Sequence, residues 1–498
     1  MTPLQTLFIL VCYFGLLILI SWLTSRNSDS TSFYTGNKKS PWYVVAFGMI
    51  GASLSGVTFL SVPGWVASTH FGYMQTVLGY MLGYIVIALV LLPLYYKMNL
   101  TSIYTYLEQR FGHLTYKTGA GYFLISRIIG ASFRLFLVAS VLHLAIFEPF
   151  GWPYWATVAL TILLIFTYTA KNGIKTVVYT DALQTFFLLA AVTLTILFIV
   201  KDLDWTWAET FTNLKNDPNT QVFHFKGNGN NVFWKQFLGG AFIALAMTGL
   251  DQDMMQKNLS ISNVKGAQRN IYAQMALFLV VNIVFLSLGA LLYQYVDIKG
   301  IVGIEKSDEL FGAVALQNAS PLVGVFFIIG LVAAAYSSAD SALTALTTSF
   351  CVDFLGFERN KPTNTKTRRW VHISFAVILF FTILIFNEVN NDSVISNLFK
   401  AAGFTYGPLL GLFAFGILTK RYFLDKHVLV ITLLSIIVTA LYYFKLPEWV
   451  EGFKPGFEVI IVNGLITFAL LWLDSILFKK EIINIHDRKK PTTDKESI

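Results

Sequence analysis

Hydroxyl-bearing side chains gather on one face of a predicted helix at AAAYSSADSAL, residues 333–343, and its continuation. Residues three, four and seven positions apart share a helix face, which places four hydroxyls in one stripe: Ser337, Ser341, Thr344 and Thr348. Ser338 lies beside this stripe, and Asp340 lies on a neighbouring face. Hydroxyls, carbonyls and a single carboxylate suit a monovalent cation better than a divalent one. The segment therefore predicts a cation site, and the alternative for Asp340 is a helix-end residue outside the membrane.

Another carboxylate and two arginines lie in other apolar stretches. Asp181 is near the start of a predicted helix, so it is either part of an ion path or a helix-start residue. Arg127 and Arg134 share one stripe, about 10 Å apart along a helix axis. A guanidinium binds a carboxylate through two hydrogen bonds. Arg134, near the middle of its span, is therefore either a substrate ligand or a partner of a structural acid, whereas Arg127 is expected to be structural.

The elements that position these residues are membrane helices. The chain has 498 residues, of which 55% are hydrophobic and 13% charged, and its mean hydropathy is +0.62. Soluble domains carry roughly 25% charged residues, and many segments here reach the ~20 apolar residues that cross a hydrocarbon core. We therefore predict an all-α polytopic membrane protein. Thirteen transmembrane helices are expected: 4–24, 41–66, 72–96, 119–146, 153–170, 177–200, 232–253, 270–295, 310–354, 369–388, 393–419, 427–444 and 457–478.

Two of these segments and the cysteines allow narrower statements. The ninth span, 310–354, is too long for one crossing and is expected to bend or extend past the bilayer. The first span, 4–24, lacks a basic leader and a cleavage site, so we expect a retained helix. Cys12 and Cys351 are far apart in sequence and predict neither a disulfide framework nor a metal site.

Positive charge is distributed unevenly among the loops. If the loops alternate from an outside N-terminus, most of the 36 Lys and Arg residues, Lys257 among them, fall on the inside. This predicts a multi-pass protein of the inner or plasma membrane whose tail, 479–498, is cytoplasmic. The net charge of +8 is then a topology signal. The expected partners are lipid, sodium and a small-molecule substrate, and no nucleic acid.

The spans form two groups of five within one transmembrane domain, residues 1–498. Residues 41–200 hold the first group and residues 232–419 the second, while 4–24 is an extra N-terminal helix and 427–478 holds two C-terminal helices. Because five is odd, the second group enters the membrane with the opposite orientation, as in an inverted repeat.

The leading span of each group contains residues that interrupt helices. FGMIGASLSGVTFLSVPGW combines glycines and hydroxyls with Pro63, and FLGGAFIALAMTGLDQDMMQ carries Gly239, Gly240 and Gly249. Interruptions at corresponding positions predict a binding site between the halves. The alternative is that small residues only allow close helix packing.

Motifs over nearly the whole chain resemble the sodium/solute symporter family. They include TSIYTYLEQRFG, NGIKTVVYTDALQ, GLDQDMMQ, AAAYSSADSAL and GPLLG, with Asn172 in place of a usual glycine. The resemblance implies a leucine-transporter-type 5+5 inverted repeat and a principal sodium site between spans two and nine. Its ligands by motif position are the carbonyls of Gly51, Leu54 and Ala334 and the hydroxyls of Ser337 and Ser338.

Some members of that family have a second sodium site, and the matching positions are Asp181, Asp340 and Ser341. Asp340 stands where several members carry a small or hydroxyl residue. Three outcomes therefore stay open for this site, namely tighter sodium binding, proton binding or no occupancy. No cofactor is expected, and sodium is the coupling ion.

The substrate is less constrained by the sequence. Sugar-carrying members use carboxylate and amide side chains in spans two, three and seven, and the corresponding stretches here offer no acid. SGVTFLSVPG is more similar to the sialic-acid and organic-anion branch, which places an arginine in span four. The expected substrate residues are Ser53, Ser55, Thr58, Gln75 and Arg134.

Together these features predict a secondary active transporter that couples inward sodium flux to uptake of a small polar solute, with a carboxylate such as a sialic acid favoured. The alternatives are a sodium-coupled sugar transporter of the same family and a transporter-like sensor or channel. The sequence has no GxxxxGK[ST] loop, which argues against an ATP-driven pump. Scattered histidines and the lack of a nucleophile–base pair argue against an enzyme.

Overall fold

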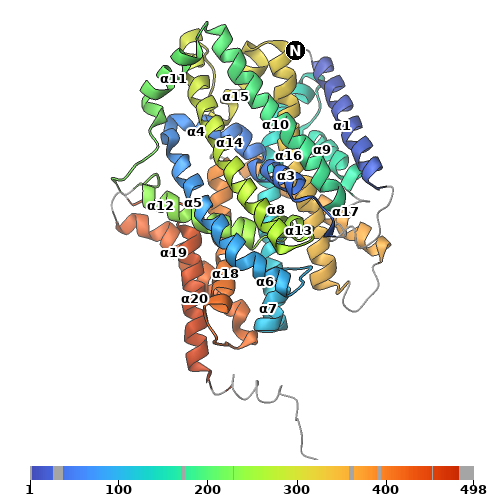
Figure 1. The fold of residues 1–498 in the computed structure, drawn as a ribbon, viewed down its shortest axis with the longest axis vertical. Coiled ribbons are helices and arrows are strands. Elements are labelled where there is room, and N and C mark those ends of the chain that lie inside the picture. Colours follow the sequence, from blue (N-terminus) through green and yellow to red (C-terminus); the bar gives the residue numbers. More distant parts are fainter. Residues whose placement is uncertain are drawn as a thin grey trace, which may run out of the picture.

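The computed structural model describes residues 3–25, 38–169, 174–227, 229–357, 364–389, 394–450, 453–479 and 481. Within these ranges the chain forms helices and no β-strand (Figure 1). Asn172 and nearly all of the tail 479–498 lie outside the described residues. The α-helices before residue 225 are α1 (Pro3–Ser25), α3 (Trp42–Leu54), α4 (Gly56–Thr69), α5 (Tyr73–Val86), α6 (Leu92–Lys97), α7 (Thr105–Arg110), α8 (His113–Leu142), α9 (Tyr154–Thr169), α10 (Ile174–Asp202) and α11 (Trp207–Asn216).

The second half of the chain has the same character. Its α-helices are α12 (Phe233–Ala244), α13 (Gln252–Leu259), α14 (Val264–Lys299), α15 (Leu310–Gly312), α16 (Pro321–Ser349), α17 (Thr365–Val389), α18 (Val394–Leu418), α19 (Val428–Trp449) and α20 (Val459–Leu477). Wider π-helical turns cover Ile87–Leu91, His143–Phe147, Leu245–Gly249, Ala313–Asn318 and Phe350–Phe354. Short 3₁₀ turns cover His70–Gly72, Glu148–Phe150, Pro218–Thr220, Ser307–Glu309 and Asp425–His427.

The molecule is a multi-pass membrane protein by the length and composition of its helices. Nine helices in the described ranges are long and apolar enough to cross a membrane, and three shorter apolar helices lie at Leu4–Ile20, Trp42–Leu54 and Tyr154–Thr167. Large apolar side chains such as Leu89 and Phe381 are exposed on the periphery. Exposed apolar surface on this scale is expected to face lipid.

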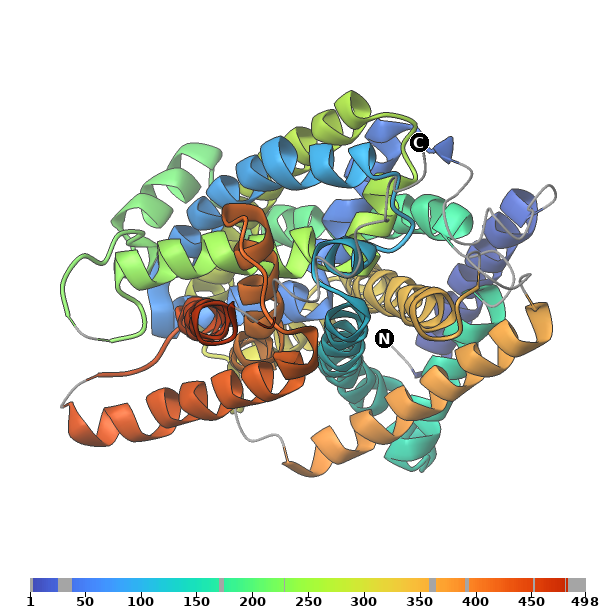
Figure 2. The same cartoon turned by 90° about the horizontal axis from the view of Figure 1, so that it is seen from below.

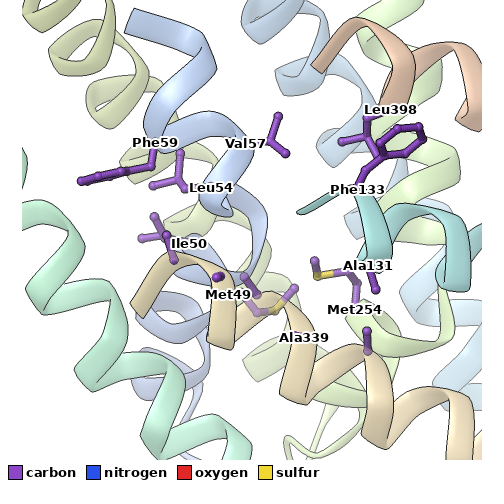
Figure 3. Close-up of a cluster of buried hydrophobic side chains, with 14 of the residues drawn as sticks. Met49, Ile50, Leu54, Val57, Phe59, Ala131, Phe133, Met254, Ala339 and Leu398 are labelled. Atoms are coloured by element: carbon purple, nitrogen blue, oxygen red, sulfur yellow. The ribbon is translucent and has the colours of Figure 1, made fainter. Parts of the chain in front are cut away.

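The second predicted span is broken, as its composition indicated. α3 ends at Leu54 and α4 begins at Gly56, and Ser55 between them has φ 25° and ψ 169°. Such a positive φ is rare for a residue other than glycine. Figure 3 shows side chains of α3 and α4 on either side of this turn, packed against residues of α8 and α16.

The seventh predicted span is also interrupted. α12 passes into a π-helical turn that ends at Gly249, and Leu250 leaves the helical region with φ −109° and ψ 11°. Asp251 then accepts hydrogen bonds from the backbone N–H groups of Asp253 and Met254, which caps the short helix α13. Both leading spans therefore contain a break, and each break exposes helix ends inside the protein.

The ninth predicted span, 310–354, is two helical segments rather than one. The first ends at Asn318, and α16 starts at Pro321. Proline is tolerated in the first turn of a helix but prevents a preceding helix from continuing through it. The expectation that this segment bends or extends is thus met by a break just before α16.

Helix α16 occupies the centre of the bundle. Every residue from Gly330 to Ser349 is buried, so its hydroxyls and Asp340 face other helices on all sides. Figures 1 and 2 show α8, α10 and α3 around it. Polar groups at this depth require partners within the protein or a bound ion.

Candidate functional site

The predicted principal sodium residues are brought together in the structure. Ser338 Oγ donates a hydrogen bond to the carbonyl of Ala52 at 3.3 Å, which joins α16 directly to the last turn of α3. Gly51, Leu54 and Ala334 are all buried at this junction. The residues that the motifs assigned to one site, from segments nearly 300 positions apart, therefore meet where α3 is broken.

Close approach of α10 explains the glycines in α3. A side chain at Gly51 would place its Cβ 2.2 Å from Thr185 Oγ1, and one at Gly48 would lie 3.0 Å from Asp181 Cβ. With no Cβ at these positions, α3 rests directly on the backbone of α10. The break at Ser55 then leaves the negative end of the α3 dipole beside Ser337 and Ser338, a favourable place for a cation.

Asp181 lies beside this junction with a partner that the sequence analysis placed elsewhere. Ser337 Oγ donates to Asp181 Oδ1 at 2.7 Å, and Lys257 Nζ donates to Asp181 Oδ2 at 2.8 Å. The side chains of Lys257 and Asp181 are 1% and 0% exposed. Lys257 was assigned to an inside loop, and that assignment is wrong because α13 folds back into the protein. We call Lys257, Asp181 and Ser337 the lysine cluster.

A second buried ion pair, between α8 and α13, contacts α16 at Ser341, one helical turn after Ser337. Arg127 forms a salt bridge with Asp253 and lies 3.8 Å from Asp251 Oδ2, measured from Nη1. Ser341 Oγ donates to Asp253, and Tyr406 donates its hydroxyl hydrogen to Asp251. The prediction that Arg127 is structural agrees with these contacts. We call Arg127, Asp253 and Ser341 the arginine cluster.

The three residues predicted for a second cation site have different hydrogen-bond partners in the structure. Asp181 belongs to the lysine cluster and Ser341 to the arginine cluster, each with its own charged partner. Asp340 Oδ1 accepts the backbone N–H of Ser341 at 2.5 Å. The hydroxyl stripe on α16 is thus used mainly to contact α13 and α10.

Four of the five predicted substrate residues line one small cavity, namely Ser53, Ser55, Thr58 and Arg134. The rest of the wall includes Tyr73, Tyr80, Tyr84, Thr248, Met247, Phe278 and Leu398. Among the described residues, the lining contains hydroxyls, apolar groups and one charge, with no carboxylate or amide side chain.

Gln75 does not line this cavity. Its Nε2 donates to the carbonyls of Gly72 and Asn231, and its Oε1 accepts the backbone N–H of His224 at 3.1 Å. The side chain therefore fastens the start of α5 to the segment before α12. Both ends of its amide are committed to backbone groups, which is a structural role.

Arg134 is buried and forms no salt bridge within the described residues, and Asp251, which also lies near Arg127, acts on its charge from a longer distance. The residue is 6% exposed, and its Nε and Nη1 atoms are buried with no hydrogen-bond partner. Hydrogen-bond donors of a buried charged group are costly when unsatisfied. Arg134 is one of the residues that line the hydroxyl-bearing cavity, so an anion in that cavity would lie beside its guanidinium group.

Several site residues were not singled out from the sequence. Lys257 and Asp253 are four positions apart on α13 and therefore share a face, a signal that was present in GLDQDMMQK. Tyr73 and Tyr84 line the cavity, while Gln274 of α14 donates to Ser53 Oγ at 3.1 Å. The structure is needed to show that Lys257 pairs with Asp181 and that Asp253 pairs with Arg127, because both pairs form only when α13 packs into the core.

Comparison with known proteins places this geometry in a family. The model of the sodium:solute symporter family matches residues 33–424. The chain belongs to that family. The predicted family is therefore confirmed, and with it the inference that the chain is a transport protein rather than an enzyme.

Curated relatives of this family member carry different solutes. The human sodium/iodide cotransporter is 23% identical over 81% of this chain, and the sodium/sialic acid symporter of Proteus mirabilis is 24% identical over 93%. The mouse sodium-coupled monocarboxylate transporter 1 is 27% identical over 78%. The matches cover 94% of the sialic acid symporter but 64% of each of the other two, less than two thirds of their length.

Solved structures show the shared fold. A Na⁺-coupled sialic acid symporter in a substrate-bound, outward-open state matches 95% of this chain and 98% of its own, with a TM-score of 0.81 and 20% identity. A nucleobase-cation-symport-1 family transporter in a closed conformation matches 90% of this chain and 95% of its own, with a TM-score of 0.55 and 13% identity. These likenesses confirm an all-α polytopic fold of the predicted type.

Proposed function

We propose that this protein is a secondary transporter that couples inward sodium flux to the uptake of a small carboxylate by alternating access. The observation that carries the proposal is Arg134, a buried guanidinium that forms no salt bridge within the described residues and that lines a hydroxyl-bearing cavity. Two parallel hydrogen bonds from Arg to a carboxylate supply both charge and orientation. The cavity wall lacks the acids and amides that would hold a neutral sugar, so the sugar alternative is less well supported.

The sodium ion is proposed to bind at the α3–α16 junction. The carbonyls of Gly51, Leu54 and Ala334 and the hydroxyls of Ser337 and Ser338 supply five oxygens. A hydroxyl that donates its hydrogen, as Ser337 does to Asp181 and Ser338 to Ala52, still has lone pairs for a cation. The contact between α3 and α16 supports this assignment, because it brings the two predicted ligand groups to one place.

The break at Ser55 would favour a cation and an anion at neighbouring positions, because it creates two helix ends of opposite partial charge. The C-terminal end of α3 carries partial negative charge, and the N-terminal end of α4, at Gly56, carries partial positive charge. A cation is favoured at the first end and an anion at the second. Ser55, at the break, and Thr58, in the first turn of α4, line the same cavity as Arg134.

The finer topology is part of the same proposal. We assign thirteen spans, with residues 41–200 and 232–419 as inverted repeats, and 427–478 as two C-terminal helices. The N-terminus is assigned to the outside and the C-terminus to the cytoplasm of an inner or plasma membrane. The breaks in the leading helix of both groups support the repeat, since each occurs after the first stretch of its span.

A thermal-shift screen tests the proposed function. Purified protein is heated with sialic acids, monocarboxylates, sugars and amino acids, each in sodium and in potassium. A ligand at 100 times its Kd adds about 2.7 kcal/mol to the stability of the folded state. We expect stabilisation by an anionic solute in sodium and little in potassium. Stabilisation by neutral sugars alone would favour the sugar alternative. Identical shifts of the melting temperature in sodium and in potassium would contradict the proposed sodium coupling.

A further inference from the structure

The lysine cluster combines three charged or polar groups around Asp181, one of the three residues predicted for a second cation site. Lys257 Nζ lies 2.8 Å from Asp181 Oδ2, and Ser337 Oγ lies 2.7 Å from Asp181 Oδ1. All three side chains are almost completely buried. Both carboxylate oxygens of Asp181 thus have a donor, and its negative charge is balanced by an ammonium that belongs to the chain itself.

We propose that the ammonium of Lys257 takes the place of a second sodium ion, so that this transporter binds one sodium ion per cycle. This inference rests on the proposed function, because it concerns the number of coupling ions. A second sodium beside Asp181 would share a single carboxylate with a lysine that already contacts it. Two like charges at one buried carboxylate disfavour each other strongly, because burial lowers the local dielectric constant.

The position of Lys257 is set by the rest of α13. Asp251 caps the start of this helix, and Asp253, one turn before Lys257, is held by Arg127 and Ser341. At the other end, Ser260 Oγ donates to the carbonyl of Lys257 at 2.7 Å. The helix is therefore fixed on both sides of the lysine, and the ammonium is a tethered cation rather than a mobile side chain at the surface.

The lysine cluster also acts on the principal sodium site. Because Ser337 Oγ donates its hydrogen to Asp181, its lone pairs are free to point toward the α3–α16 junction. Asp181 is in turn held by Lys257. Lys257 is thus a positioning residue, which acts on the sodium ligand Ser337 through Asp181.

Direct counting of bound ions tests the inference. Equilibrium binding of ²²Na⁺ to purified protein, at saturation and without organic solute, gives the number of sodium ions per molecule. We expect one for the unaltered protein. Lys257→Met leaves Asp181 without a cation and is expected to raise the count to two, whereas Lys257→Arg keeps a cation and is expected to leave it at one. Adding Asp181→Asn to Lys257→Met should restore one.

The outcomes separate this inference from the proposed function. A count of two in the unaltered protein overturns the inference and leaves sodium coupling intact, while a count of zero overturns the sodium assignment itself. A count of one in well-folded Lys257→Met also overturns the inference, because the vacated carboxylate then attracts no ion. If Lys257→Met fails to fold, Lys257→Gln, which retains a hydrogen-bond donor, provides the same comparison.

Discussion

Two arginines on helix α8 experience opposite environments although they are two helical turns apart. Arg127 forms a salt bridge with Asp253 and lies near Asp251, so acids of the chain itself neutralise it. Arg134 is equally buried but forms no salt bridge within the described residues, and it lines the cavity that Ser55 and Thr58 also line.

The comparison identifies which of the two buried arginines forms a salt bridge and, within the described residues, which does not. Ionisable groups inside a membrane protein are costly and are normally paired. A charge held by its own acid stabilises the fold, whereas a charge without one favours whatever anion enters its cavity. We therefore infer that Arg127 stabilises the fold and that Arg134 belongs to the substrate site. The two residues are matched in type, helix and burial, so each is the control for the other.

The largest effect is expected for Arg134→Met, which removes the guanidinium but keeps most of the side-chain volume. Hydrogen bonds to charged groups contribute roughly 1.5–3 kcal/mol each, so losing two lowers affinity for an anionic solute at least about a hundredfold. The melting temperature is expected to stay level or rise, because an unsatisfied buried charge is removed. Calorimetric titration and thermal unfolding measure the two effects. Unchanged affinity would remove Arg134 from the site.

Arg127→Met is expected to act on stability instead. Breaking a buried ion pair by removing one partner costs roughly 3–5 kcal/mol, because Asp253 is left without its cation. Thermal unfolding should show a marked drop in melting temperature, and Asp253→Asn in the same chain should recover part of it. A loss of solute affinity with normal stability would reverse the roles assigned to the two arginines.

A smaller effect is expected for Ser338→Ala, which removes one proposed sodium ligand. Losing a hydroxyl partner costs roughly 1–3 kcal/mol, or about fivefold to a hundredfold in sodium affinity. The sodium dependence of the melting temperature measures it. Thr344→Val on the same helix is the matched control, since its buried Oγ1 has no partner. Equal sodium affinities in the two variants would contradict the ligand assignment.

Thr58→Val should have a still smaller effect, because it replaces one cavity hydroxyl by a methyl group of the same size. A neutral hydrogen bond contributes about 0.5–1.5 kcal/mol, which corresponds to a few-fold loss of solute affinity. Sodium affinity should not change, since Thr58 lies on the anion side of the break. Competition binding with the solute found in the thermal-shift screen measures this difference.

Gln75→Leu should have the smallest effect on binding. Its amide contacts the backbone of Gly72, Asn231 and His224 rather than the cavity. We expect unchanged solute affinity and a loss of stability of about 1–3 kcal/mol from the buried groups left without partners. A pronounced loss of affinity in a stable variant would return Gln75 to the substrate residues.

The sequence predicts the helical membrane class, the break near Ser55 and the meeting of α3 with the serines of α16. These follow from local composition and from motifs at fixed positions. It does not predict that Lys257 is buried, because a lysine just after an apolar span is usually a loop residue. It predicts that Arg127 is structural but does not identify its partner, Asp253. Both outcomes depend on where α13 folds, and that is decided by contacts between residues 76 to 126 positions apart in the chain.

The central claim is that sodium binding at the α3–α16 junction is coupled to the uptake of an anionic solute that binds at Arg134. Its most direct test is uptake of labelled N-acetylneuraminate, lactate and pyruvate into proteoliposomes under an inward sodium gradient. The account predicts that at least one carboxylate accumulates above its external concentration in sodium but not in potassium, and that Arg134→Met abolishes this accumulation. Accumulation by Arg134→Met at the unaltered rate, or equal uptake in potassium, would contradict the account.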